Sequence, residues 1–224
     1  MSFISDLQKK LDTSSDTTEA LAMAKYMKNK FVFFGIKTTP RRIILKTLRN
    51  KYQTEIQSNT RTIVLDLFEK KEREFHYCAI EILMTELKNN YQKEDLSLIK
   101  KLLTTHSWWD TVDTISKHIL GNYLLQFPEC IDETITDFTH DNNFWLNRST
   151  LLFQLGYQSK TNFELLQQLC LKHKNSNEFF IQKAIGWALR EYAKHQPEAV
   201  RKFVAHASLK PLSRKEALKN LPVA

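Results

Sequence analysis

Apolar residues recur along the chain at the three- and four-residue spacing of amphipathic helices. In one such stretch Phe75, Ala79, Ile82 and Leu83 fall on one helical face, and polar residues lie between them. We find no sustained alternation of apolar and polar residues, which would mark half-buried strands. The pattern therefore predicts an all-α protein. The expected helices cover residues 3–11, 16–27, 39–48, 59–69, 72–86, 95–103, 109–113, 128–138, 145–148, 162–171, 177–194 and 198–207, and a last helix opens at 213–216.

Local signals mark several helix starts. Residues 16–19 and 213–216 have the spacing of a capping box, in which the first and fourth side chains cap the helix reciprocally. Thr39 would be a cap, followed by Pro40 at the first helical position. Polar residues 141–143 precede the helix that holds the third tryptophan. Because the links between helices are short, neighbouring helices should pack antiparallel.

Composition agrees with this assignment. The 224 residues include only four glycines and five prolines, which leaves little material for the many turns of a sheet protein. A chain of this length could form one large domain or two, and we expect a single domain over residues 1–224. Cys78, Cys130 and Cys170 lie in apolar helical contexts and form no CxxC pair, so we expect buried free thiols in a reducing compartment. We expect no signal peptide and no membrane span, so the cytoplasm is the predicted location.

The net charge of +8 favours a polyanionic partner, with nucleic acid first and an anionic membrane surface second. A merely basic protein without such a partner is the alternative. Arg41 and Arg42 follow Pro40 in a first helical turn, where the helix dipole disfavours cations. A bound phosphate would explain them, since helix N-termini and arginines both bind anions. They could equally be an ordinary exposed pair.

The stretch THSWWDTVD at 105–113 holds two of the four tryptophans. Trp109 and Asp113 are one helical turn apart and so share a face. An aromatic wall beside a carboxylate could hold and stabilise a cation. The alternative is that Trp109 belongs to the core and that Asp113 is solvated or caps a neighbouring group.

A weak repeat surrounds this pair. Aromatic residues recur at intervals of 34, 36 and 35 residues, at Phe75, Trp109, Trp145 and Phe180. The residues four positions later are Ala79, Asp113, Ser149 and Ala184. A period near 35 residues in a helical chain indicates stacked helix pairs that form a solenoid with a concave face. A carboxylate at a position otherwise held by small residues is costly unless it has a partner or a function.

Several motifs are absent. The sequence has no nucleotide-binding glycine loop, no HExxH or other metal-ligand spacing, and no GxSxG serine elbow. Metal, nucleotide and acyl-transfer chemistry are therefore not expected, and we predict neither a metal nor a cofactor. A carboxylate, aromatic residues and arginines on a basic helical array remain as candidate chemistry.

Nearly the whole chain resembles a known family. The segments that carry the resemblance are YMKN at 26–29, FGI at 34–36, PRR at 40–42, EREF at 72–75, SWWD at 107–110 with Val112 and Asp113, WL at 145–146 with Arg148, FFIQKAIGW at 179–187, LREYAK at 189–194 and PLSR at 211–214. With these residues the chain resembles the AlkD-type DNA alkylation repair glycosylases, which are built from HEAT-like helical repeats. The one departure is mild: the sequence ends with residues 221–224, so we expect any further C-terminal segment of the family to be missing.

The resemblance implies an all-α, HEAT-like helical-repeat solenoid with a concave basic face. It implies removal of N3- and N7-alkylated purines, such as 3-methyladenine and 7-methylguanine, from double-stranded DNA without base flipping. The family's catalytic aspartate falls on Asp113, its two site tryptophans on Trp109 and Trp187, and its site arginine on Arg148. The residues expected to contact DNA are Tyr26, Thr39, Arg41, Arg42, Lys183 and Arg190. We expect a monomer without an obligate protein partner.

Two other functions stay open from the residues alone. A noncatalytic DNA-binding repeat protein would keep a basic face and be indifferent to Asp113. A protein-interaction solenoid, the commonest use of helical repeats, would bind DNA weakly and without a steep salt dependence.

Overall fold

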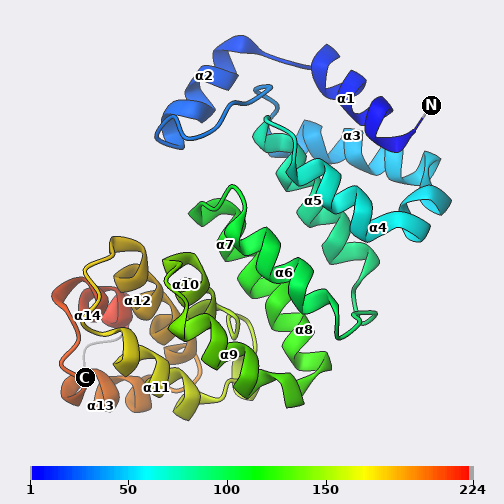
Figure 1. Cartoon of the computed structure of the whole chain (residues 1–224). Coiled ribbons are helices and arrows are strands. Elements are labelled where there is room, and N and C mark those ends of the chain that lie inside the picture. The colour runs from blue at the N-terminus through cyan, green and yellow to red at the C-terminus, as the bar shows by residue number, and fades with distance from the viewer. Residues whose placement is uncertain (1, 222–224) are drawn as a thin grey trace. The chain divides into compact units, whose positions relative to one another are not determined.

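A computed structural model describes residues 2–221, and within that range the regular elements are helices (Figure 1). The predicted all-α, helical-repeat class is confirmed; the concave basic face stays a prediction. The contacts divide the chain into two compact units, Met1–Asn90 (unit 1) and Tyr91–Ala224 (unit 2). The expectation of one domain over residues 1–224 also stays a prediction. None of the helices within residues 2–221 is long and apolar enough to cross a membrane.

Unit 1 holds five helices over its described residues. They are α1 Phe3–Thr13, α2 Thr17–Tyr26, α3 Thr38–Lys51, α4 Gln53–Phe68 and α5 Arg73–Glu86. The apolar side chains predicted to face inward do so: Phe75, Ala79, Ile82 and Leu83 of α5 are fully buried. Helices α4 and α5 pack closely together, as expected for neighbours joined by a short link.

Two helix starts in unit 1 differ from the predictions. The α3 helix begins at Thr38, and its N-cap Lys37 makes no side-chain capping bond, so the predicted cap at Thr39 is wrong. The α4 helix begins six residues before the predicted Asn59, which instead has non-helical angles (φ −130°, ψ 23°) inside the helix. The polar run before Asn59 hid the first part of α4 from the periodicity. At α2 the predicted cap is present, because the Asp16 carboxylate accepts the Glu19 N–H at 3.0 Å.

A buried carboxylate anchors the connection between α2 and α3. The Glu74 side chain of α5 accepts backbone N–H bonds from Phe34, Gly35 and Ile36 at 3.0–3.1 Å, and it is fully buried. Gly35 has φ +88°, and a Cβ there would lie 2.0 Å from the Asp16 carbonyl oxygen. The apolar segment predicted as a link is therefore held in one conformation by Glu74, and glycine is required at its tightest point.

Unit 2 continues the helical series. Its elements are α6 Asp95–Thr104, α7 Trp109–Ile115, a π-helix Ser116–Leu120, α8 Gly121–Gln126, a 3₁₀ turn Pro128–Cys130, α9 Ile131–His140, α10 Phe144–Leu152, a second 3₁₀ turn Gln158–Lys160, α11 Phe163–His173, α12 Phe179–Ala193, α13 Pro197–His206 and α14 Pro211–Leu218. The most extensive pairing joins α12 to α14, and α10 packs on both α12 and α7 (Figure 1).

The weak repeat has a structural basis. Each of its four aromatic residues lies in the first turn of a helix: Phe75 in α5, Trp109 in α7, Trp145 in α10 and Phe180 in α12. The small residues four positions later, Ala79, Ser149 and Ala184, are completely buried. Asp113 occupies the corresponding position in α7, so the repeat correctly marked it as a carboxylate at a packed position.

Two smaller predictions need correction. Cys78 and Cys170 are buried free thiols as expected, but Cys130 is only half-buried because it sits in a short 3₁₀ turn. The final helix begins at Pro211 with Lys210 as its N-cap and no side-chain cap, so residues 213–216 do not form a capping box. The Ser213 hydroxyl instead donates to the Gln182 carbonyl oxygen at 3.0 Å.

Replacing Glu74 by glutamine should destabilise the protein by about 2–3 kcal/mol, because the amide group presents N–H donors toward backbone donors and the charge-assisted bonds are lost. Urea unfolding followed by circular dichroism measures the change. Asp66→Asn on the exposed face of α4 removes the same charge and should be nearly neutral. Equal stabilities of the two variants would contradict the anchoring role.

Candidate functional site

Unit 2 contains a largely buried ion pair between α7 and α10, formed by two residues that lie 35 positions apart in the sequence. The Arg148 guanidinium of α10 binds the Asp113 carboxylate of α7 with both of its prongs, Nε to Oδ1 at 2.7 Å and a terminal nitrogen to Oδ2 at 2.9 Å. The second terminal nitrogen of Arg148 donates to the carbonyl oxygen of Phe180 in α12. One arginine thus links α7, α10 and α12, and it fixes the plane of the carboxylate.

Burial sets the electrostatics of this pair. The Asp113 side chain keeps only 15% of its surface exposed and the Arg148 side chain 5%. Burial raises the pKa of the Asp113 carboxyl above its ordinary value, while the hydrogen bonds and charge of Arg148 oppose that rise. Each carboxylate oxygen accepts one bond from Arg148 and retains a second lone pair. The carboxylate can therefore also accept from a water molecule or face a cation.

The pair lies in the wall of an open hollow of about 410 Å³. The predicted residues Trp109, Asp113, Arg148 and Trp187 all line it, so the structure brings the sequence-predicted set together in unit 2. Lys183 and Arg190, predicted as DNA contacts, line the same hollow. The residues that sequence reasoning did not assign to the site are Phe179, Phe180 and Glu216.

Phe180 lines the hollow and belongs to an aromatic cluster of unit 2. The centroid of the Phe180 ring lies 5.1 Å from that of Trp108 and 4.9 Å from that of Trp145. The Phe144 ring is nearly parallel to Phe180, with a centroid distance of 6.4 Å. Phe179 stands at the rim with 56% of its surface exposed. Phe180 could have been suspected, because it was one of the four repeat aromatics; an exposed aromatic such as Phe179 gives no comparable signal in the sequence.

The backbone around α7 explains how Trp109 and Asp113 reach the hollow. Trp108 is extended (φ −156°, ψ 161°), so α7 begins abruptly at Trp109. The helix passes into a π-helix at Ser116, whose hydroxyl donates to the Val112 carbonyl oxygen at 2.6 Å. Such widened turns occur preferentially at functional sites, where they redirect neighbouring side chains. Trp109 and Asp113 are one turn apart on the short α7 and line the same hollow, as their spacing predicted.

Helix α14 contributes Glu216 to the lining of the hollow. Glu216 accepts from Lys183 at 2.9 Å and from Arg190 at 2.8 Å, and Arg190 also donates to the Glu216 backbone oxygen at 2.7 Å. These two cations hold the pKa of the Glu216 carboxyl at about 2. Close approach of α14 to α12 depends on Gly186, since a Cβ there would lie 2.3 Å from the Glu216 Cβ and 2.9 Å from the Ser213 carbonyl oxygen.

Unit 1 carries the other predicted DNA contacts. Tyr26, Thr39 and Arg42 have exposed side chains. Arg41 is buried and donates to the Glu81 carboxylate at 2.9 Å, and Arg42 donates to the same oxygen at 2.9 Å. Glu81 of α5 therefore accounts for two cations in the first turn of α3 without a phosphate. A phosphate contact by Arg41 stays a prediction, and burial weighs against it; Arg42 keeps the exposure that such a contact needs.

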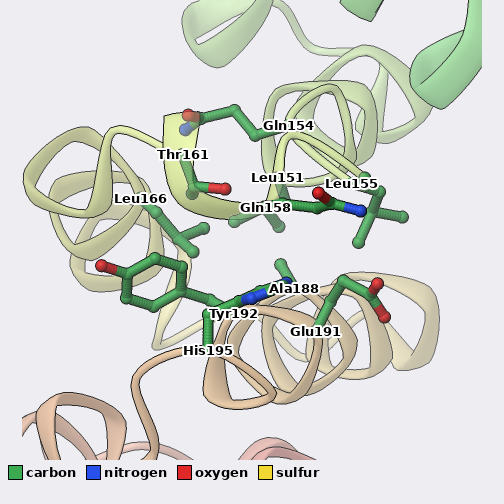
Figure 2. Close-up of a pocket in the computed structure, with 11 residues that line it drawn as sticks. Leu151, Gln154, Leu155, Gln158, Thr161, Leu166, Ala188, Glu191, Tyr192 and His195 are labelled. Atoms are coloured by element: carbon green, nitrogen blue, oxygen red, sulfur yellow. The ribbon is translucent and has the colours of Figure 1, made fainter.

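A second cavity in unit 2 differs from this hollow in size and enclosure. Figure 2 shows Gln154 and Thr161 on one side of a small space and Tyr192 and Glu191 of α12 on the other. The volume of this space is about 10 Å³. A space of that size holds about one water molecule. A water molecule there can form hydrogen bonds with polar side chains inside the fold, but the cavity is too small to admit a substrate.

Comparison with known proteins shows the family of the chain. The family described as DNA alkylation repair enzyme matches residues 7–221, and the chain belongs to this family. A solved structure described as a predicted DNA alkylation repair enzyme from Enterococcus faecalis is 31% identical, with a TM-score of 0.86, and the match covers 94% of this chain and 98% of that one. Among the curated proteins, none matches the chain. The resemblance inferred from the sequence is thereby confirmed.

Gly186→Ala tests the packing of α14 against the site. An alanine inside an exposed helix would stabilise by about 1 kcal/mol relative to glycine. Here the Cβ meets backbone atoms of α14, so we expect a lower melting temperature and weaker protection of α14 amides from hydrogen exchange. A stabilised variant with unchanged exchange would show that α14 does not pack closely on α12.

Proposed function

We propose that the protein is a cytoplasmic, monofunctional DNA glycosylase that hydrolyses the N-glycosidic bond of N3- and N7-alkylated purines in double-stranded DNA. The observation that supports this activity best is the Asp113–Arg148 pair, buried in the wall of a hollow that Trp109 and Trp187 also line. Family membership supports a role in alkylation repair. We propose that the enzyme acts as a monomer and needs no cofactor.

The chemistry of the lesion explains why so few groups suffice. Alkylation at N3 or N7 places a positive charge on the purine, so the base leaves as a neutral molecule and takes the electrons of the bond to C1′. The deoxyribose then acquires oxocarbenium-like positive charge, which is the main barrier. Water adds its oxygen to C1′ and releases a proton, and the product is an abasic site. The protein must therefore stabilise a cation and orient a water molecule.

Asp113 is suited to both tasks. Its carboxylate is fixed before the reaction begins, so it stabilises the developing sugar charge without costly reorganisation. Its remaining lone pairs can accept a hydrogen bond from the attacking water and take up the released proton. The role of Arg148 is to keep the Asp113 carboxylate ionised and in one orientation. In the absence of substrate, its positive charge balances the negative charge of the buried carboxylate.

Trp109 and Trp187 would act through their ring faces. Cations are attracted to the electron-rich face of an indole, and the interaction is worth about 2 kcal/mol when water is excluded. Rings that contact the sugar favour the cationic transition state over the less charged ground state of the sugar, which is the differential binding that raises a rate. Phe180, which also lines the hollow, packs against Trp108 and Trp145 and so adds an apolar surface beside these rings.

Binding to duplex DNA would use cations at the edge of this hollow, Lys183 and Arg190, and the exposed unit 1 residues Tyr26, Thr39 and Arg42. Contacts to phosphate position the protein but carry no sequence information. Base flipping requires an enclosed pocket for the extruded base. The hollow at Asp113 is open, which favours an enzyme that approaches the sugar while the base stays stacked.

Two alternatives lack comparable support. A noncatalytic DNA-binding repeat protein gives no reason to bury a carboxylate beside two partly exposed tryptophans. A protein-interaction solenoid does not account for three cations beside that carboxylate in one hollow. Measuring DNA affinity at several salt concentrations distinguishes a DNA-binding enzyme from a protein-interaction solenoid. Phosphate contacts make the affinity fall steeply as the salt concentration rises.

Asp113→Asn should reduce the single-turnover rate of 7-methylguanine release from a duplex by about 10²–10³-fold, as removal of a preorganised electrostatic group does elsewhere. Binding to the same duplex should persist. Asp110→Asn is the matched control, since it removes a nearby acid that does not line the hollow, and it should excise at close to the wild-type rate. An Asp113→Asn variant as active as Asp110→Asn would contradict the mechanism.

The pH dependence gives an independent test. The reaction needs ionised Asp113, and burial raises the pKa of this carboxyl, so activity should fall on acidification at a higher pH than for an exposed aspartate. Arg148→Lys keeps the charge but loses the two-pronged bond that opposes this rise. The acid limb of the excision rate should therefore move to still higher pH. An acid limb that stays in place, or moves to lower pH, would contradict Asp113 as the titrating group.

A further inference from the structure

Two cations of α12 share one carboxylate at the edge of the hollow. Lys183 and Arg190 are seven residues apart, or two helical turns, and both line the hollow with Trp187 between them. Each binds a different oxygen of Glu216, Lys183 to Oε1 and Arg190 to Oε2. The Glu216 carboxylate therefore occupies the kind of position, between two cations, in which an anionic ligand would bind.

Glu216 is held there by more than the ion pairs. Arg190 also binds its backbone oxygen, and the Ser213 hydroxyl one turn earlier is tied to the carbonyl of Gln182. Gly186 allows the two helices to approach at this point. The Glu216 side chain is only 12% exposed, so it cannot swing freely into solvent as a surface glutamate would.

The charge balance of the hollow depends on this residue. Three cations and two carboxylates line it: Lys183, Arg190 and Arg148 against Asp113 and Glu216. The net charge is +1 with Glu216 ionised and would be +2 without it. Intact DNA is an anion, so its binding strengthens as this charge increases. An alkylated nucleotide carries a positive charge of its own, so its binding gains less.

We propose that Glu216 is a specificity-determining residue, which masks Lys183 and Arg190 so that the hollow discriminates between a cationic nucleotide and undamaged DNA. This inference rests on the proposed glycosylase function. Masking lowers the affinity of the site for ordinary phosphate backbone, so undamaged duplex is released. Masking also offsets one positive charge near the sugar, which would otherwise repel the positive charge that develops there.

Glu216→Gln tests the inference with two duplexes of one sequence. One is undamaged, and the other carries a single pyrrolidine nucleotide, whose protonated ring mimics the cationic sugar. We expect the variant to bind the undamaged duplex about three- to tenfold more tightly at low salt, with a salt dependence steeper by about one phosphate contact. The preference for the pyrrolidine duplex should fall correspondingly. Unchanged or weaker binding of undamaged DNA would overturn the inference.

Glu198→Gln is the matched control, because it removes the same charge from a side chain in α13 that is 80% exposed and lies outside the hollow. It should leave the preference unchanged. Lys183→Gln changes the charge of the hollow in the opposite direction, so it should weaken binding to undamaged DNA and increase the preference for the pyrrolidine duplex. A reduced preference in Lys183→Gln would overturn the inference even if Glu216→Gln failed to fold.

The wild-type protein separates this inference from the function on which it rests. If it neither releases 7-methylguanine nor prefers the pyrrolidine duplex, the proposed function fails and the role of Glu216 fails with it. If it does both, and Glu216→Gln shows the same preference as Glu198→Gln, only the role of Glu216 is overturned.

Discussion

The buried pair of Asp113 and Arg148 is the constraint on which the site depends. A carboxylate removed from water needs a cation and hydrogen bonds, and breaking such a pair by removing one partner is strongly destabilising. Arg148 meets this need from α10 and also binds the backbone of α12. The position of the carboxylate is therefore tied to the packing of three helices, and the same bonds that make its burial tolerable hold it where a cation can be stabilised.

Two other carboxylates, one in each unit, also pair with cations. Glu81 pairs with Arg41 and Arg42 in unit 1, and Glu216 pairs with Lys183 and Arg190 in unit 2. The count of 33 lysines and arginines thus overstates the cations available to a polyanion. Which of them bind DNA depends on exposure and on internal partners, which are properties of the fold and not of the composition.

Much of this could be predicted from the sequence because the signals were local. Helical periodicity, the cap at Asp16 and the spacing of Trp109 and Asp113 each depend on a few neighbouring residues. What was missed involved partners distant in the chain. Glu216 has the spacing of a capping box in the sequence, but in the structure it makes no cap and binds two cations of α12. Arg41 pairs with Glu81, a partner 40 residues away that the local sequence does not reveal. The polar first half of α4 gave no apolar period to detect.

The central claim is that the hollow around Asp113 cleaves the glycosidic bond of a cationic nucleotide. The most direct measurement incubates wild-type protein with a duplex that carries one 7-methylguanine and quantifies the free base and the abasic strand against a control without protein. The predicted result is release of 7-methylguanine and formation of intact abasic strand in equal amounts. No normal guanine should be released. Tight, salt-sensitive binding to the duplex without release of the base would show that the protein binds DNA but is not a glycosylase for this lesion.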